Sequence, residues 1–143
     1  ELRLKELKSK SKPSVAMAAN LFSTLVYQNI RQPSMIPSIT QFLLAGRDNS
    51  GVSLFNISPD GLLKEVEDYS ASGSGMVNVF PILDTYYKKN ISLSEAATLA
   101  KKCVSAAIGR DPASGEGIDI YVVTKDEVKQ VASQKLSNEF KDE

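Results

Sequence analysis

The sequence predicts a layered α+β fold, and two patterns along the chain, with the order in which they occur, support this. Apolar residues recur at helical spacing in two long segments, residues 15–30 and 93–108. Three shorter segments between them, at 39–45, 52–57 and 62–69, have strand patterns separated by turn residues. The predicted order is therefore helix, three strands, two helices, strand and helix, which is typical of helices grouped away from a mainly antiparallel sheet.

The first segment of the chain has the pattern of a helix that lacks an N-cap residue. Leu4 and Leu7 are spaced as on a helix, yet no Ser, Thr, Asp or Asn precedes them as a cap. We expect that upstream sequence is missing, although a frayed terminal helix would give the same pattern. Pro13 then fits the first turn of the helix at 15–30, which Pro33 and Pro37 are expected to end.

Three strands are expected to follow as an antiparallel meander. Residues 39–45 are mostly apolar, which predicts a strand covered on both faces. Turn-forming residues at 48–51 and 58–61 separate it from the alternating strand at 52–57 and from a weaker strand at 62–69.

The second half of the chain is expected to be mainly helical. A glycine-serine stretch at 71–75 leads into a helix at 76–88, and Ser92 with Glu95 forms a capping box for the next helix, which ends near 108. A polar loop at 109–117 precedes a strand at 118–123. A short final helix is then suggested by four apolar residues, Val128, Val131, Leu136 and Phe140.

The composition excludes several kinds of chemistry within these 143 residues. The chain contains no histidine, and therefore no Ser-His-Asp triad, Cys-His pair or imidazole base. Its single cysteine excludes an internal disulfide and multi-cysteine zinc sites. Lys and Arg together number 17, as do Asp and Glu, which argues against nucleic acid or a membrane surface as partner. We expect no cofactor, no bound metal and, without an export signal or disulfides, a cytoplasmic location.

Two glycine-rich loops are the candidates for chemistry. The first, Gly73-Ser74-Gly75, is a near miss for the dinucleotide-binding fingerprint, because Asn78 stands where the third glycine belongs. A flexible corner between a strand and a helix is the commoner use of such a sequence.

The second loop carries Asp111 and Ser114. A carboxylate with a hydroxyl nearby can orient an ammonium group or a hydroxyl nucleophile, and Gly115 and Gly117 allow close backbone approach. An aspartate that only closes its own turn is the commoner case.

Five segments taken together resemble the β subunits of the core-particle proteasome, especially the archaeal type. They are residues 43–48, 54–61, 69–75, 92–96 and 109–115, and the resemblance extends from residue 1 to about 128. Its most specific parts are the Gly-Ser-Gly corner and the Arg-Asp-x-x-Ser-Gly loop, with an alanine-rich helix between them.

This resemblance implies an N-terminal nucleophile hydrolase with a four-layer αββα sandwich of antiparallel sheets, here without its N-terminal strands. Residues 1–143 would then be a single domain, forming two thirds or more of a β-type subunit at its C-terminal end. Such enzymes cut peptide bonds with an N-terminal threonine, which self-cleavage of a propeptide exposes. Their base is the α-amino group, whose reference pKa of about 7.7–8.0 suits proton transfer near neutrality.

By the same resemblance, Ser74, Asp111 and Ser114 support the threonine and its amine. The nucleophile itself lies outside these residues, because no threonine of this chain is at its N-terminus. The implied partners are other β subunits and α subunits in stacked seven-membered rings, and the implied substrates are unfolded polypeptides, degraded inside the cell in an ATP-dependent pathway. Two alternatives remain open: a non-catalytic structural subunit of the β ring, and a small-molecule binding domain that uses the Gly73-Ser74-Gly75 corner.

Overall fold

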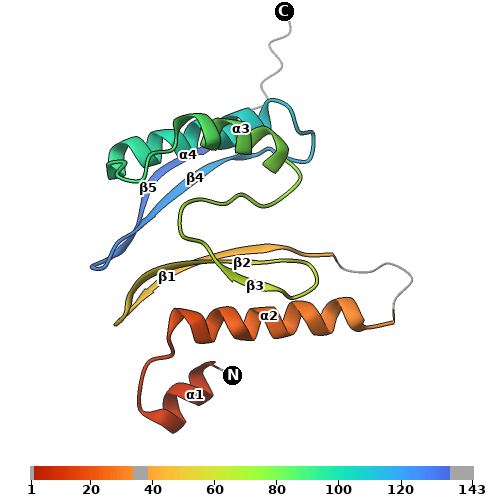
Figure 1. Cartoon of the computed structure of the whole chain (residues 1–143), viewed down its shortest axis with the longest axis vertical. Coiled ribbons are helices and arrows are strands. Elements are labelled where there is room, and N and C mark those ends of the chain that lie inside the picture. Colours follow the sequence, from red (N-terminus) through yellow and green to blue (C-terminus); the bar gives the residue numbers. More distant parts are fainter. Residues whose placement is uncertain (1, 34–38, 136–143) are drawn as a thin grey trace, which may run out of the picture. The chain divides into compact units, whose positions relative to one another are not determined.

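The computed structural model describes residues 2–33 and 39–135, and the chain divides into two compact units (Figure 1). The first unit is Glu1–Ser70 with Val123–Asp126, and the second is Ala71–Val122 with Glu127–Glu143. Both contain helices and paired strands, so the predicted α+β class is confirmed.

The first unit contains two helices and a three-stranded sheet. Its elements are α1 (Leu2–Ser9), α2 (Val15–Arg31), β1 (Phe42–Asp48), β2 (Gly51–Ile57) and β3 (Leu63–Glu65). The strands form the predicted antiparallel meander in the order β1-β2-β3, with Leu44 opposite Phe55 and Phe55 opposite Glu65. The third strand is shorter than its predicted range. The expected helix stop at Pro37 lies outside the described residues.

The core of this unit lies where α2 packs against the sheet. Val15 and Ala19 of α2 meet Phe55 of β2, with Leu44 and Leu63 packed around them. Helical spacing places Val15 and Ala19 on one face of α2, while alternation along β2 directs Phe55 toward them.

The expectation that β1 is covered on both faces is wrong within the described residues. Phe42 and Leu43 keep 39% and 38% of their surface exposed. The prediction failed because an apolar run marks a strand of high hydrophobicity without showing what covers its second face.

The start of α2 is anchored by its own cap and by the end of β1. The Ser14 hydroxyl accepts a hydrogen bond from the Met17 backbone N–H, which satisfies one of the unpaired donors of the first turn. The Val15 N–H donates to Oδ2 of Asp48 at 2.7 Å. Hydrogen bonds from the Ser50 hydroxyl, then from the Val15 and Ser50 N–H groups, lower the pKa of Asp48.

We predict that Asp48→Asn destabilises the protein at neutral pH and has little effect in acid. The lowered pKa means that ionised Asp48 stabilises the fold above its ordinary value of 3.8, and that this stabilisation is lost as pH falls through the lowered folded value. Urea unfolding of the complete subunit at several pH values tests this. A difference in midpoint from wild type that persists unchanged in strong acid would refute the role of the charge.

The second unit places two helices over a β-hairpin (Figure 1). Its elements are α3 (Met76–Tyr86), α4 (Leu93–Ile108), β4 (Gly117–Val123) and β5 (Val128–Lys135). The predicted capping box of α4 is present: the Ser92 hydroxyl accepts from the Glu95 N–H, and the Glu95 carboxylate accepts from the Ser92 N–H. The buried side chains of this unit come from α4, from β4 and from the segment before α3. They are Leu99, Cys103, Ala107, Ile118, Ile120 and Ala71.

The prediction of a final helix is wrong, because residues 128–135 form strand β5. The connection from β4 is only four residues long, so β5 can fold back and pair with β4 through backbone hydrogen bonds. Val128 and Val131 fit a helical spacing, but valine is also a good strand former, and pairing with a neighbouring strand decided the outcome. Leu136 and Phe140, the other two residues behind that prediction, lie outside the described residues.

Neither a membrane span nor a metal cluster is found in the part of the chain that the structure describes. None of its helices is both long and apolar enough to cross a bilayer. No three acidic or cysteine side chains among residues 2–33 and 39–135 are grouped so that they could hold a metal ion.

Candidate active site

The Gly73-Ser74-Gly75 corner forms the turn that starts α3. Gly73 has a φ of +101°, a conformation that favours glycine, and its carbonyl accepts a hydrogen bond from the Met76 N–H at 3.1 Å. Gly75 is the N-cap residue of α3, and it offers no side chain for capping. The corner therefore presents Ser74 just before the first turn of the helix.

Asp111 lies directly after α4 and is held by backbone hydrogen bonds on both sides. Its N–H donates to the Ala107 carbonyl at 2.8 Å, and its own carbonyl accepts from the Ser114 N–H at 3.0 Å. Its Oδ1 accepts from the Ala113 N–H at 3.1 Å. Asp111 thus closes its own turn, as the simpler interpretation of the loop predicted.

The structure also brings together all three candidate residues. The Ser74 hydroxyl donates to Asp111 Oδ2 at 2.5 Å, across a separation of 37 residues. The Ser114 hydroxyl donates to the same oxygen at 2.7 Å. Asp111 therefore does more than close a turn, because its second carboxylate oxygen joins two loops that flank different helices.

These hydrogen bonds lower the pKa of Asp111. The Ser74 hydroxyl contributes most, followed by the Ser114 hydroxyl and the Ala113 N–H. The carboxylate is therefore ionised at neutral pH. Because each serine donates its proton to Asp111, the remaining lone pairs of both hydroxyls are free to accept hydrogen bonds.

This arrangement suits a cationic or proton-donating group better than an anion. A carboxylate with two polarised hydroxyls can bind an ammonium group through charge-assisted hydrogen bonds. A phosphate placed at the same corner would meet the negative charge of Asp111, which counts against nucleotide binding there.

Gly75 and Ala107 belong to the site, and their close approach to each other was not predicted from the sequence. A Cβ atom placed on Gly75 would lie 2.7 Å from Cβ of Ala107, 3.0 Å from Oγ of Ser114 and 3.3 Å from Oδ2 of Asp111. The available signal was the alanine-rich sequence of α4, because small side chains allow a neighbouring segment to come close, although they do not show which segment it is. Gly115 and Gly117 were both expected to allow close approach of the backbone. At Gly117 this is confirmed, because a Cβ placed there would lie 2.5 Å from the Gln134 carbonyl oxygen. At Gly115 it is wrong, because a Cβ placed there would meet no atom within 4 Å.

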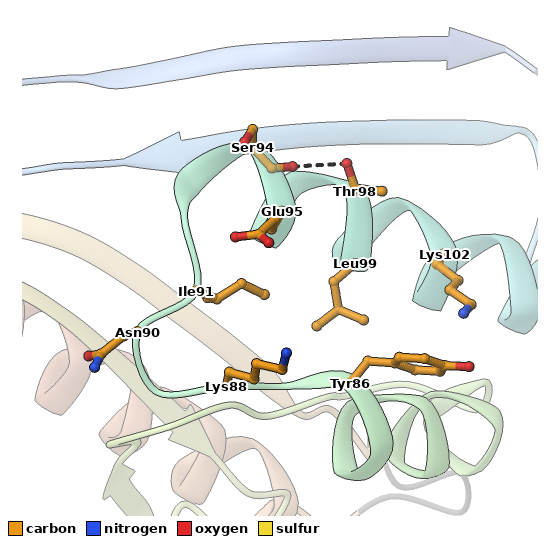
Figure 2. Close-up of a pocket in the computed structure, with 9 residues that line it drawn as sticks. All are labelled: Tyr86, Lys88, Asn90, Ile91, Ser94, Glu95, Thr98, Leu99 and Lys102. Carbon is orange, nitrogen blue, oxygen red and sulfur yellow. Dashed lines mark hydrogen bonds between the residues drawn. The ribbon is translucent and has the colours of Figure 1, made fainter.

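A separate cavity of about 500 Å³ lies between the end of α3 and the first half of α4 (Figure 2). Ile91 and Leu99 point into it from one side, and Tyr86 and Lys88 lie on the other. The Lys102 ammonium lies 3.7 Å from the centre of the Tyr86 ring, a cation–π contact. None of the residues that line this cavity belongs to the cluster around Asp111.

Comparison with known proteins shows what the sequence of this chain is similar to. A family model described as "Proteasome subunit" matches residues 1–123. The chain is 39% identical over 125 residues to "Proteasome subunit beta 2" of Thermofilum pendens, an alignment that covers 87% of this chain and 59% of that protein. It is 33% identical over 136 residues to "Proteasome subunit beta" of Archaeoglobus fulgidus, covering 95% and 62%. It is 46% identical over 108 residues to "Proteasome subunit beta 2" of Staphylothermus marinus, covering 76% and 50%. The chain thus spans between half and two thirds of the length of these relatives.

Proposed function

Because the chain belongs to the proteasome subunit family, we propose that it forms part of a β-type subunit of a core-particle proteasome and that the complete subunit hydrolyses peptide bonds. Relatives with 33–46% identity carry the name of the β subunit, which supports the choice of β over α. The observation that supports a catalytic role most directly is the pair of serine hydroxyls donating to one oxygen of Asp111.

In the proposed reaction, the nucleophile is an N-terminal threonine outside these 143 residues. Its hydroxyl oxygen attacks the peptide carbonyl carbon, and its α-amino group takes the hydroxyl proton and becomes an ammonium group. Asp111 stabilises this positive charge, while Ser74 and Ser114 accept hydrogen bonds from the amine. The ammonium group then gives its proton to the leaving amine of the substrate as the peptide bond breaks, which leaves the acyl part of the substrate bound to the threonine as an ester. A water molecule attacks this ester, the amine takes the proton of the water and returns it to the threonine oxygen, and the carboxylic acid product leaves.

The proposal extends to the fold and the assembly. We propose that the two units belong to a single domain with a four-layer αββα sandwich, which the observed helices and antiparallel strands support. The subunit would join other β subunits and α subunits in stacked rings that enclose the active sites. Its substrates would be unfolded polypeptides in the cytoplasm.

Ser74→Ala in the complete subunit is expected to lower kcat for a fluorogenic peptide about 3- to 10-fold, with KM nearly unchanged. The variant removes the hydrogen bond that contributes most to lowering the pKa of Asp111. The pKa of Asp111 therefore rises toward its ordinary value of 3.8, which still leaves the carboxylate ionised near neutrality. The expected loss at neutral pH comes from the missing hydroxyl beside the amine. Steady-state kinetics of the assembled particle at neutral pH measures this loss.

Ser72→Ala, the same substitution two residues earlier, is the matched control and should leave kcat unchanged. Wild-type kcat in Ser74→Ala would contradict the role of Ser74. An assembled wild-type particle in which this subunit hydrolyses no peptide would identify it as the structural subunit of the ring instead.

A further inference from the structure

We propose that the contact between Gly75 and Ala107 sets the position of the Ser74 hydroxyl against the Asp111 carboxylate, which makes both of them positioning residues. The activity measurement used to test this inference rests on the proposed function, whereas the geometry on which it stands does not.

Gly75 carries one side of this contact and follows Ser74 directly in the chain. Its φ of −73° is accessible to every residue, so backbone conformation does not explain why a glycine stands here. Space does explain it, because a Cβ on Gly75 would lie 2.7 Å from Cβ of Ala107. Non-bonded carbon atoms prefer separations of about 3.5–4.0 Å, so the backbone segments that carry Gly75 and Ala107 could not stay at their present distance.

Ala107 carries the other side and is linked to Asp111 through the backbone. It is buried in the last turn of α4, and its carbonyl accepts hydrogen bonds from the N–H groups of Arg110 and Asp111, at 3.1 and 2.8 Å. Any shift of Ala107 is therefore passed to Asp111 through a single hydrogen bond.

The two sides explain how a small contact controls the site. One partner of the contact is bonded covalently to Ser74, and the other holds the backbone of Asp111. Pushing them apart by an ångström would lengthen the 2.5 Å Ser74–Asp111 hydrogen bond beyond the usual range for hydroxyl donors. Misplacement on this scale can cost up to about 100-fold in rate.

The test is a double-mutant cycle in the complete subunit, assembled into its particle. Gly75→Ala is expected to lower kcat about 10-fold with KM changed by less than about twofold. Ala107→Gly removes the atom that the new Cβ would approach most closely, and the next contact, Ser114 Oγ at 3.0 Å, is the end of a side chain that can move by a few tenths of an ångström. Gly75→Ala combined with Ala107→Gly is therefore expected to recover most of the lost kcat. Gly115→Ala is the matched control, because the added methyl group enters open space in the neighbouring loop.

Crystal structures of the variants give a second reading that does not depend on activity. The Ser74 Oγ–Asp111 Oδ2 distance is expected to exceed about 3.2 Å in Gly75→Ala and to return to hydrogen-bonding range in the double variant. Wild-type kcat in Gly75→Ala, an unchanged distance, or a loss that Ala107→Gly does not recover would each overturn the inference. Absence of peptidase activity in the wild-type particle would instead refute the proposed function, and the distances would still decide the inference.

Discussion

Asp111→Asn in the complete subunit is expected to lower kcat for peptide hydrolysis about 100-fold, the low end of what the loss of one group that stabilises charge in the transition state costs. The amide has no negative charge with which to stabilise the ammonium group formed on the nucleophile. It also cannot reproduce the present hydrogen bonds fully, because one of its two polar atoms is a donor, while Asp111 now accepts at both oxygens. Steady-state kinetics on the purified particle measures the loss.

A control variant and a second expected effect make this prediction specific. Asp119→Asn is the matched control, because the amide oxygen can still accept the hydrogen bond from the Gln130 side chain, and it should leave kcat unchanged. Self-cleavage of a propeptide would use the same groups, so the Asp111→Asn subunit should also retain unprocessed precursor on a denaturing gel. Rings should still form. Wild-type turnover in Asp111→Asn would rule out Asp111 as part of the catalytic machinery.

Gly61→Ala is expected to destabilise the complete subunit by about 3 kcal/mol, the sum of conformational strain and steric overlap. Gly61 has a φ of +83°, which side chains with a Cβ rarely adopt. A Cβ there would also lie 2.6 Å from Cβ of Tyr27 and 3.0 Å from the Ser23 carbonyl oxygen, both on α2. The present fit is tight because the Ser23 hydroxyl donates to the Gly61 carbonyl at 2.6 Å.

Gly51→Ala separates the two causes of this loss. Gly51 also has a positive φ, +129°, but a Cβ there meets no atom within 4 Å, so its substitution carries strain without overlap. Urea unfolding of both variants should therefore show the larger loss for Gly61→Ala. Equal losses would mean that close approach to α2 contributes nothing at Gly61.

Local signals predicted most of the elements, because each of these elements is determined by residues close together in the chain. The capping box at Ser92 marks the start of α4, and the turn residues at 58–61 separate β2 from β3 as expected. Cys103 of α4 is buried, and this burial raises the pKa of its thiol.

The predictions that failed concern contacts between segments far apart in the chain, which the sequence alone does not reveal. Residues 128–135 have an ambiguous pattern, and only pairing with β4 makes them a strand. The residues alone indicated both loops as candidates, but only the family resemblance joined Ser74 and Asp111 in one site, since nothing in their spacing shows that their side chains meet. Gly75 was missed as a contact because its φ is ordinary, and only the position of Ala107 reveals why a side chain is excluded.

The most direct test of the whole account is the N-terminal sequence of the mature subunit, determined on protein isolated from a particle that hydrolyses peptides. The cluster around Asp111 is proposed to hold a terminal amine, so the account predicts threonine as the first residue. Any other first residue, in a subunit whose own peptidase activity is retained, would contradict it.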